Sequence, residues 1–499
     1  MPHTEVCGRV KHHPISAHVK AGFDYIISPC CCPLYPPCPI IPLTPSQEAP
    51  MPEPSFAELQ RLGRKHIWTP HTQLNDLDDP DYLGIIVGGQ GSYVYDSNGK
   101  AYLDATSMSH CTLVGHARQE IAAAVYKQMS AVEFAGSGMI PFSTPPTVKL
   151  AAKLAELSPG DLDRTLFTTS GTESVEAALK MARQYHAQTG NPQKYKVLYR
   201  DFSFHGFTWG AMAVSGDPVI RSPMFEPMHP MGVMVPEANP SRCQFCADQC
   251  NLGCARAIED TVRYHGPDSI AAFIVEPVEK GAVAQPPEYW RIVQDLCRKH
   301  NILIIADEVV TAFGRTGKWF GSLHASLETD IMVFGKTLGG GYLPIGAVLT
   351  SPKVQDGFRG DRSKNLRHSP TLAAHPASTI AALTNLEIVE REGLVERAEK
   401  MGYRLRDGLH ALRRYSVVAD VRSIGMLAAV DLGKDGDVHQ PLGLELGKKM
   451  SRFMLDNGLF MVTRGANFSI HPPLTISESE LDQVLDILDR TLAFAEENL

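Results

Sequence analysis

Residues 302–308 (ILIIADE) and 331–336 (IMVFGK) decide the fold of this chain. Each is a short, wholly apolar run that ends in a charged residue. Such runs predict strands buried on both faces, as in a mostly parallel sheet covered by helices. Sheets of this kind bind ligands beyond the carboxyl ends of their strands. Asp307 and Lys336 are therefore predicted to lie together at that edge.

The same pattern extends outward from these two runs. Further apolar strands are expected at 166–167, 196–199 and 271–275, and amphipathic helices at 175–185 and 289–300. After about residue 366 a long helical pattern runs to residue 413, followed by strands near 417–421 and 427–430. Strand–helix alternation of this kind predicts an α/β fold.

Composition excludes several classes of protein. The 499 residues carry a net charge of −8, which argues against a nucleic-acid binder. No apolar run is long enough to cross a membrane, and the start shows no signal-peptide pattern. The eleven cysteines do not resemble a disulfide framework, so we expect a cytoplasmic location. Residues 1–50, with ten prolines and five cysteines, are expected to form an irregular tail.

Three features suggest one cofactor. Ser170-Gly171-Thr172-Glu173 follows a predicted strand and opens a helix, with Ser170 and Glu173 in the capping-box spacing. A helix start of this kind suits a phosphate, although a plain capped helix has the same pattern. Asp307 could pair with a cationic ring or simply cap a loop. Lys336, before a glycine-rich turn, suits imine chemistry if it is buried, or is otherwise solvated. Together they indicate a cofactor with a phosphate, a basic ring nitrogen and an aldehyde.

Longer motifs around these positions resemble the class-III pyridoxal-phosphate aminotransferases, the omega-aminotransferase or amine–pyruvate aminotransferase-like group. The resemblance runs from about His66 to Leu488, and its most specific pair is 306–317 (ADEVVTAFGRTG) with 334–336 (FGK). The stretches 91–104, 167–183 (FTTSGTESVEAALKMAR) and 204–206 (FHG) add to it.

The resemblance implies the aspartate-aminotransferase-like fold, fold type I. A large domain with a mostly parallel sheet would span 105–365. A smaller α+β domain would combine 51–104 with 366–499, leaving 1–50 as the tail. The active site would require a homodimer.

The resemblance also implies site roles for pyridoxal 5′-phosphate. Lys336 would form the imine link and move the substrate proton, and Asp307 would pair with the pyridine nitrogen. Val309 and Phe204 would flank the ring, and Thr371 would reach the phosphate from the partner subunit. The other expected cofactor contacts are Ser170, Gly171, Thr172, His205 and Gly206.

Departures from the family pattern bear on the substrate. Val310 and Gly281 stand where ornithine-type members carry a glutamine and a glutamate, which favours an amine–pyruvate-like site. Trp68 resembles the entrance tryptophan of those members, or is a domain-edge aromatic. Arg464 is a candidate receptor for the keto-acid carboxylate, or a surface arginine.

Two alternatives remain open. Cys243, Cys246, Cys250 and Cys254 could hold a structural metal or could be thiols without metal, and we expect no catalytic metal. The expected reaction is ping-pong transfer of an amino group from an amine or amino acid to a keto acid. An aminomutase or a decarboxylating enzyme would use the same lysine and aspartate.

Overall fold

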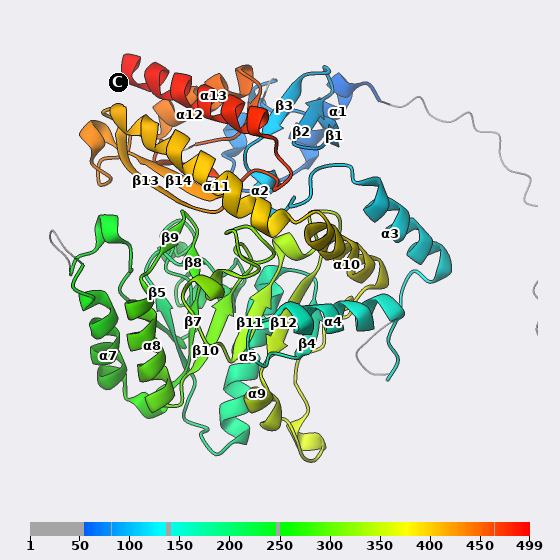
Figure 1. The fold of residues 1–499 in the computed structure, drawn as a ribbon, viewed down its shortest axis with the longest axis vertical. Helices are drawn as coiled ribbons and strands as arrows, with labels where there is room; N and C mark the ends of the chain where they lie inside the picture. Colours follow the sequence, from blue (N-terminus) through cyan, green and yellow to red (C-terminus); the bar gives the residue numbers. More distant parts are fainter. Residues whose placement is uncertain (1–53, 81, 136–140, 246–249, 464) are drawn as a thin grey trace, which may run out of the picture. The chain divides into compact units, whose positions relative to one another are not determined.

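The computed structural model describes residues 54–80, 82–135, 141–245, 250–463 and 465–499, and Figure 1 shows their arrangement. The chain divides into two units, of which Phe56–Leu499 contains nearly all of the described residues. The fold below is that of the second unit. The predicted tail at 1–50 lies outside the described residues.

A seven-stranded sheet of described residues forms the centre of this unit (Figure 1). All neighbouring strands are parallel except β12, which is antiparallel to both of its neighbours. The mostly parallel sheet is thus confirmed, and each predicted apolar run is one of its strands. The order is β4 (Arg164–Thr168), β12 (Gly346–Thr350), β11 (Ile331–Phe334), β10 (Leu303–Asp307), β7 (Ile270–Val275), β5 (Lys196–Arg200) and β6 (Gly232–Val235).

Both faces of this sheet are buried, and alternate residues of each strand enter different cores. In β10, Leu303 and Ile305 pack with α5 (Gly171–Gln188), whereas Ile304 and Ala306 join the core that contains α8 (Pro287–Lys299). This burial explains the continuous apolar runs, because no face is left for polar residues. The two helices predicted at 175–185 and 289–300 are α5 and α8.

One of the smaller sheets combines N-terminal and C-terminal segments. β1 (Ile86–Gln90), β2 (Tyr93–Asp96) and β3 (Ala101–Asp104) are joined by β15 (Leu459–Phe460), which pairs with β3 in parallel. This pairing agrees with a small domain built from N- and C-terminal segments. The expected boundaries at 104 and 365 stay predictions, because Phe56–Leu499 is one compact unit.

Two further small sheets and eleven other α-helices complete the described part of Phe56–Leu499. A second small sheet has the order β13 (Val418–Ile424), β14 (Leu427–Leu432) and β16 (Asn467–Ile470), and β8 (Val278–Glu279) pairs with β9 (Val283–Ala284). The other helices are α1 (Phe56–His66), α2 (Ser107–His110), α3 (Gln119–Ala131), α4 (Pro145–Leu157), α6 (Trp209–Ala213), α7 (Gly253–His265), α9 (Pro352–Asp356), α10 (Pro376–Arg391), α11 (Leu394–Ala411), α12 (Leu444–Asp456) and α13 (Glu478–Glu497). Among the described residues, no helix has both the length and the apolar character of a membrane span.

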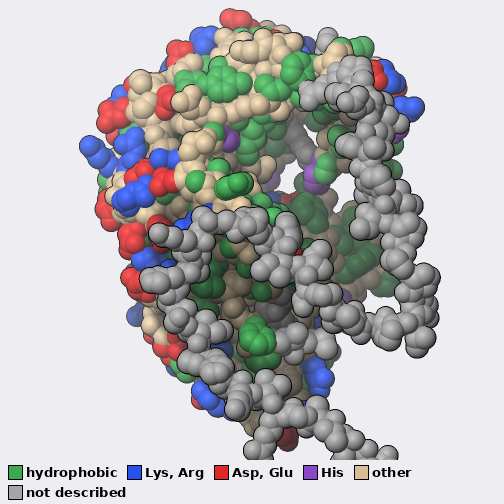
Figure 2. Space-filling model, turned by 90° about the vertical axis from the view of Figure 1, so that its right-hand side faces the viewer, with side chains coloured by type: hydrophobic (Ala, Val, Ile, Leu, Met, Phe, Trp, Pro, Cys, Tyr) green, Lys and Arg blue, Asp and Glu red, His purple; other side chains and the backbone are tan. Residues whose placement is uncertain are grey.

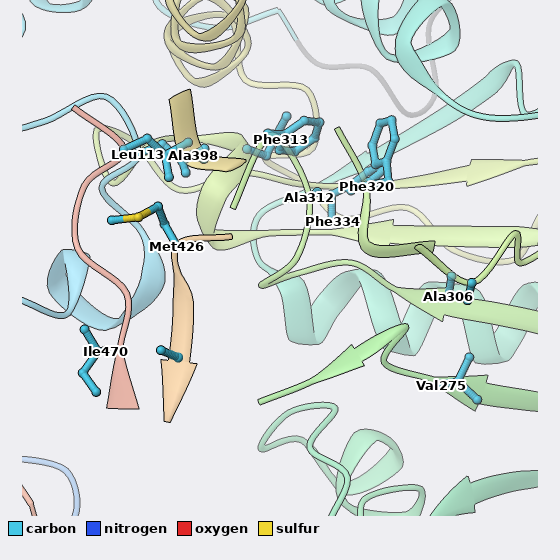
Figure 3. Packing of buried hydrophobic residues seen from close by; sticks show 14 of the residues in the cluster. Leu113, Val275, Ala306, Ala312, Phe313, Phe320, Phe334, Ala398, Met426 and Ile470 are labelled. Carbon is cyan, nitrogen blue, oxygen red and sulfur yellow. The ribbon is translucent and has the colours of Figure 1, made fainter. Parts of the chain in front are cut away.

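Three phenylalanines support the segment that links β10 to β11. The ring centroids of Phe313 and Phe334 lie 5.2 Å apart, and Phe320 lies 5.7 and 5.8 Å from them (Figure 3). All three are fully buried. Because Phe334 is the last residue of β11, this cluster fixes the position from which Lys336 leaves the sheet.

Candidate active site

The carboxyl ends of the parallel strands converge on one pocket of about 830 Å³. Thr169 follows β4, Glu276 follows β7, Asp307 ends β10, and Lys336 stands two residues after β11. All four lie at or just after the ends of strands, the edge where the sequence predicted Asp307 and Lys336. Asp307 and Lys336 both line this pocket, and their roles there stay predictions.

Asp307 is held in place by a histidine. Its Oδ2 lies 2.7 Å from Nδ1 of His205, and its Oδ1 accepts the backbone N–H of Val309 at 3.1 Å. Both side chains are buried. An ionised carboxylate only accepts hydrogen bonds, so pairing with ionised Asp307 requires the tautomer of His205 that carries its proton on Nδ1. The buried negative charge is then available to a cation inside the pocket.

Lys336 opens a short 3₁₀ turn with a positive φ of 20°. No hydrogen bond fixes its ammonium group among the described residues, and its Nζ lies 5.9 Å from the ring centroid of Phe204. Burial lowers the pKa of Lys336, while the charges of Asp307 and Glu276 partly oppose that shift. A lysine with a lowered pKa has more of the neutral amine, which is the form that attacks a carbonyl carbon.

The start of α5 lies against this lysine. Ser170 caps the helix by accepting the N–H of Glu173 at 3.2 Å. The predicted capping box is only half formed, because the carboxylate of Glu173 accepts from the N–H and hydroxyl of Thr169 at 2.6 and 2.8 Å instead. The first helical residues, Gly171 and Thr172, line the pocket with the positive end of the helix dipole.

Glycines keep the pocket walls close together. A Cβ on Gly171 would lie 2.9 Å from both methyl groups of Val309, and one on Gly335 would lie 2.7 Å from backbone atoms of Gly171. A Cβ on Gly206 would lie 2.4 Å from the hydroxyl of Thr172. These contacts leave a narrow cradle between the helix start and the strand ends.

The residues present fit pyridoxal 5′-phosphate. The helix start offers backbone N–H groups to a phosphate, and Asp307 offers a buried negative charge to a ring N–H. The Lys336 amine faces the same space. Val309 and Phe204 supply apolar and aromatic surface on its walls.

Two predicted residues lie elsewhere, and a third cannot be placed among the described residues. Trp68 is 78% exposed, and Thr371 is also exposed; neither lines the pocket. Arg464 lies outside the described residues.

The cysteine cluster is only partly described, because Cys246 lies outside the described residues. Burial raises the pKa of Cys254 to about 12, with a further contribution from Cys243. No set of three metal-ligating side chains comes together in the described part of the chain.

Sequence reasoning missed several residues that line the pocket. Glu276 follows β7, so the strand-end rule could have found it. His110 and Cys111 were missed because four consecutive non-glycine residues, Ser107–His110, have positive φ, which no local sequence signal indicates. Asp217 and Lys280 also line the pocket, from segments far apart in sequence.

Known proteins resemble this chain over most of its length. The profile of the aminotransferase class-III family matches residues 78–492. A probable aminotransferase from Mycobacterium tuberculosis is 35% identical, covering 89% of this chain and 96% of that protein. A putrescine–pyruvate aminotransferase from Pseudomonas aeruginosa is 32% identical, covering 87% and 97%. The solved omega-transaminase from Pseudomonas jessenii in complex with PMP is 31% identical, with a TM-score of 0.83 over 88% of this chain and 98% of that one.

Proposed function

The chain belongs to the class-III aminotransferase family, and from this premise we propose that its pocket transfers an amino group from an amine to a keto acid with pyridoxal phosphate. Class-III aminotransferases are pyridoxal-phosphate enzymes, and this chain is a transaminase. The observation that carries the site assignment is that Lys336, Asp307 and the start of α5 share one pocket.

Bound pyridoxal phosphate supplies an aldehyde carbon and a ring that withdraws electrons from the substrate. Lys336 holds the cofactor through its Nζ. Once released from the cofactor, the same Nζ would take the proton from the substrate carbon that bears nitrogen. Burial supports both roles, because it keeps more of the amine neutral near the operating pH.

Asp307 keeps the pyridine nitrogen protonated in this proposal. His205 and the N–H of Val309 each contact one carboxylate oxygen of Asp307, so the carboxylate is held in one orientation. His205 acts as a positioning residue. The start of α5, with Ser170, Gly171 and Thr172, would hold the phosphate, and Gly206 permits the close approach of its loop to Thr172. Val309 and Phe204 flank the ring.

We propose a homodimer in which Thr371 completes the phosphate site of the partner subunit. Thr371 is exposed and does not line the pocket of its own chain, and its neighbour Leu372 is 54% exposed. Figure 2 shows hydrophobic side chains at the surface over much of the described part of one face, with charged side chains gathered along one side. Trp68, also exposed, would reach a pocket entrance only within such an assembly. Sedimentation of the purified chain measures the oligomeric state.

We propose pyruvate as the acceptor and an amine as the donor, by similarity to the putrescine–pyruvate aminotransferase of Pseudomonas aeruginosa. The pocket walls support an amine donor, since Val219, Ile220 and Val310 line it with apolar surface.

The test is formation of alanine from pyruvate by the purified, pyridoxal-phosphate-loaded chain with a panel of amines that includes putrescine. Turnover that requires the keto acid is the expected result. Turnover of an amino acid without any keto acid would instead support the aminomutase or decarboxylating alternative, which the aminotransferase relatives do not favour.

A further inference from the structure

We propose that Lys280 binds the carboxylate of acidic substrates, and that Asp217 holds this lysine when no such substrate is present. The proposal rests on the transaminase function above and adds a residue that determines which substrates are accepted. Both side chains line the pocket that contains Lys336 and Asp307.

The ammonium group of Lys280 lies at the pocket wall. It contacts Oδ2 of Asp217, and its Nζ is 5.2 Å from the ring centroid of Phe204. The Nζ of Lys336 contacts the same ring at 5.9 Å. A substrate whose reacting carbon lies at Lys336 therefore has a second cation within reach of its acid group.

The positive charge of Lys280 acts on Lys336. Burial is the main cause of the lowered pKa of Lys336, and the positive charge of Lys280 lowers it further. An anion bound at Lys280 would thus act near the reacting centre rather than at a remote surface.

Asp217 is the fixed member of the ion pair. Its Oδ1 accepts the N–H of Val219 at 2.8 Å, and its own N–H donates to the carbonyl of Ser203 at 3.0 Å. Its side chain is 12% exposed, whereas that of Lys280 is 42% exposed. A flexible four-carbon stem lets the lysine leave Asp217 while the aspartate stays in place.

The backbone beneath Lys280 is also fixed. Lys280 follows β8 in the turn that leads to β9, and the carbonyl of Gly281 accepts from Nε of Arg422 at 3.0 Å. The preceding Glu279 is buried and pairs with Arg200 at 3.1 Å. Only the lysine side chain needs to move when a substrate binds.

Lys280 loses little interaction free energy when it leaves Asp217 for a substrate carboxylate. A partly exposed ion pair contributes little stability, because water competes for both charges. No arginine lines the pocket within the described ranges, and Lys336 is committed to the cofactor. Lys280 is therefore the described cation that remains for a carboxylate.

The test compares pyruvate with propanal, an acceptor that lacks a carboxylate, in the pyridoxal-phosphate-loaded chain. In Lys280→Met the preference for pyruvate over propanal, as a ratio of kcat/KM, should fall about 10- to 100-fold, the scale for losing a charged hydrogen bond. Lys280→Arg should restore most of it. Asp217→Asn, which removes the competing carboxylate, should lower KM for pyruvate.

Opposite effects of the two substitutions distinguish a binding site from a structural ion pair. Equal losses for pyruvate and propanal in Lys280→Met, or a parallel loss in Asp217→Asn, would overturn the proposal. An unchanged preference in Lys280→Met would also overturn it.

A second measurement does not depend on turnover. Propionate binding to the loaded chain, followed by calorimetry, should be lost in Lys280→Met and kept in Lys280→Arg. Equal propionate affinity in wild type and Lys280→Met would refute the role of Lys280. If the wild-type chain binds propionate through Lys280 but transfers no amino group to pyruvate or propanal, the proposed function fails while the carboxylate site stands.

Discussion

Gly335→Ala tests whether the cradle between β11 and α5 sets cofactor affinity. Gly335 has a φ of −163° and a ψ of −142°, outside the left-handed region. The added Cβ would, however, lie 2.7 Å from both Cα and N of Gly171. Carbon atoms pack comfortably at about 3.5–4.0 Å, so the strand end and the helix start must separate by about 1 Å.

The cost follows from which atoms are in the way. Backbone atoms cannot rotate aside, and the nearest side chain, Val309, lies only 3.3 Å from the new Cβ. Overpacking of this kind costs about 1–3 kcal/mol. If the strain is taken up by moving Lys336 away from the start of α5, pyridoxal-phosphate affinity should fall by roughly 5- to 150-fold.

The assay is absorbance titration of the apo chain with pyridoxal phosphate, together with thermal unfolding of the apo form. Gly84→Ala is the matched control, because its added Cβ meets no heavy atom within 4 Å. The control should bind the cofactor as the wild type does. Unchanged affinity and unfolding midpoint in Gly335→Ala would refute the argument that this close approach positions the cofactor.

Three further predictions concern single features. Lys336→Ala should lose the borohydride-reducible link to the cofactor, measured by mass spectrometry, and nearly all transamination; a retained link would place the reactive amine elsewhere. Asp307→Asn should slow exchange of the substrate α-proton, followed by NMR, by orders of magnitude while the cofactor still binds, and an unchanged rate would make Asp307 a loop cap. Deletion of residues 1–50 should leave kcat and the unfolding midpoint nearly unchanged, because this stretch has no periodic apolar pattern; insoluble protein would contradict that reading.

The strands of the central sheet could be predicted because burial on both faces makes their sequences continuously apolar. The run at 331–334 coincides with β11, and the run at 302–306 differs from β10 by one residue at each end. Once these strands are parallel and adjacent, the positions of Asp307 and Lys336 follow from chain direction alone. Much of the candidate site was thus available from local sequence.

Features that depend on distant contacts could not be predicted. β12 is apolar too, but its antiparallel direction follows from how the chain returns to the sheet. The positive φ values of Ser107–His110 depend on acceptors elsewhere: Asp104 accepts from the N–H of Met108, and Ser107 donates to the carbonyl of His471. The contact of Lys280 with Asp217 joins residues 63 positions apart.

The pair Asp307 and Glu308 shows how one motif serves both the site and the fold. Asp307 faces the pocket, whereas the carboxylate of Glu308 is fully buried and lines no part of it. Glu308 instead accepts the N–H groups of Gly321 and Ser322 at 2.8 and 2.7 Å. Burial raises the pKa of Glu308, and these donors, with the hydroxyl of Thr311, oppose that shift. Asp307 ends the strand and Glu308 immediately follows it, so the two adjacent acids point to different surroundings. The Asp307 carboxylate is left for chemistry in the pocket. The Glu308 carboxylate ties the segment after β10 to the turn at Gly321–His324.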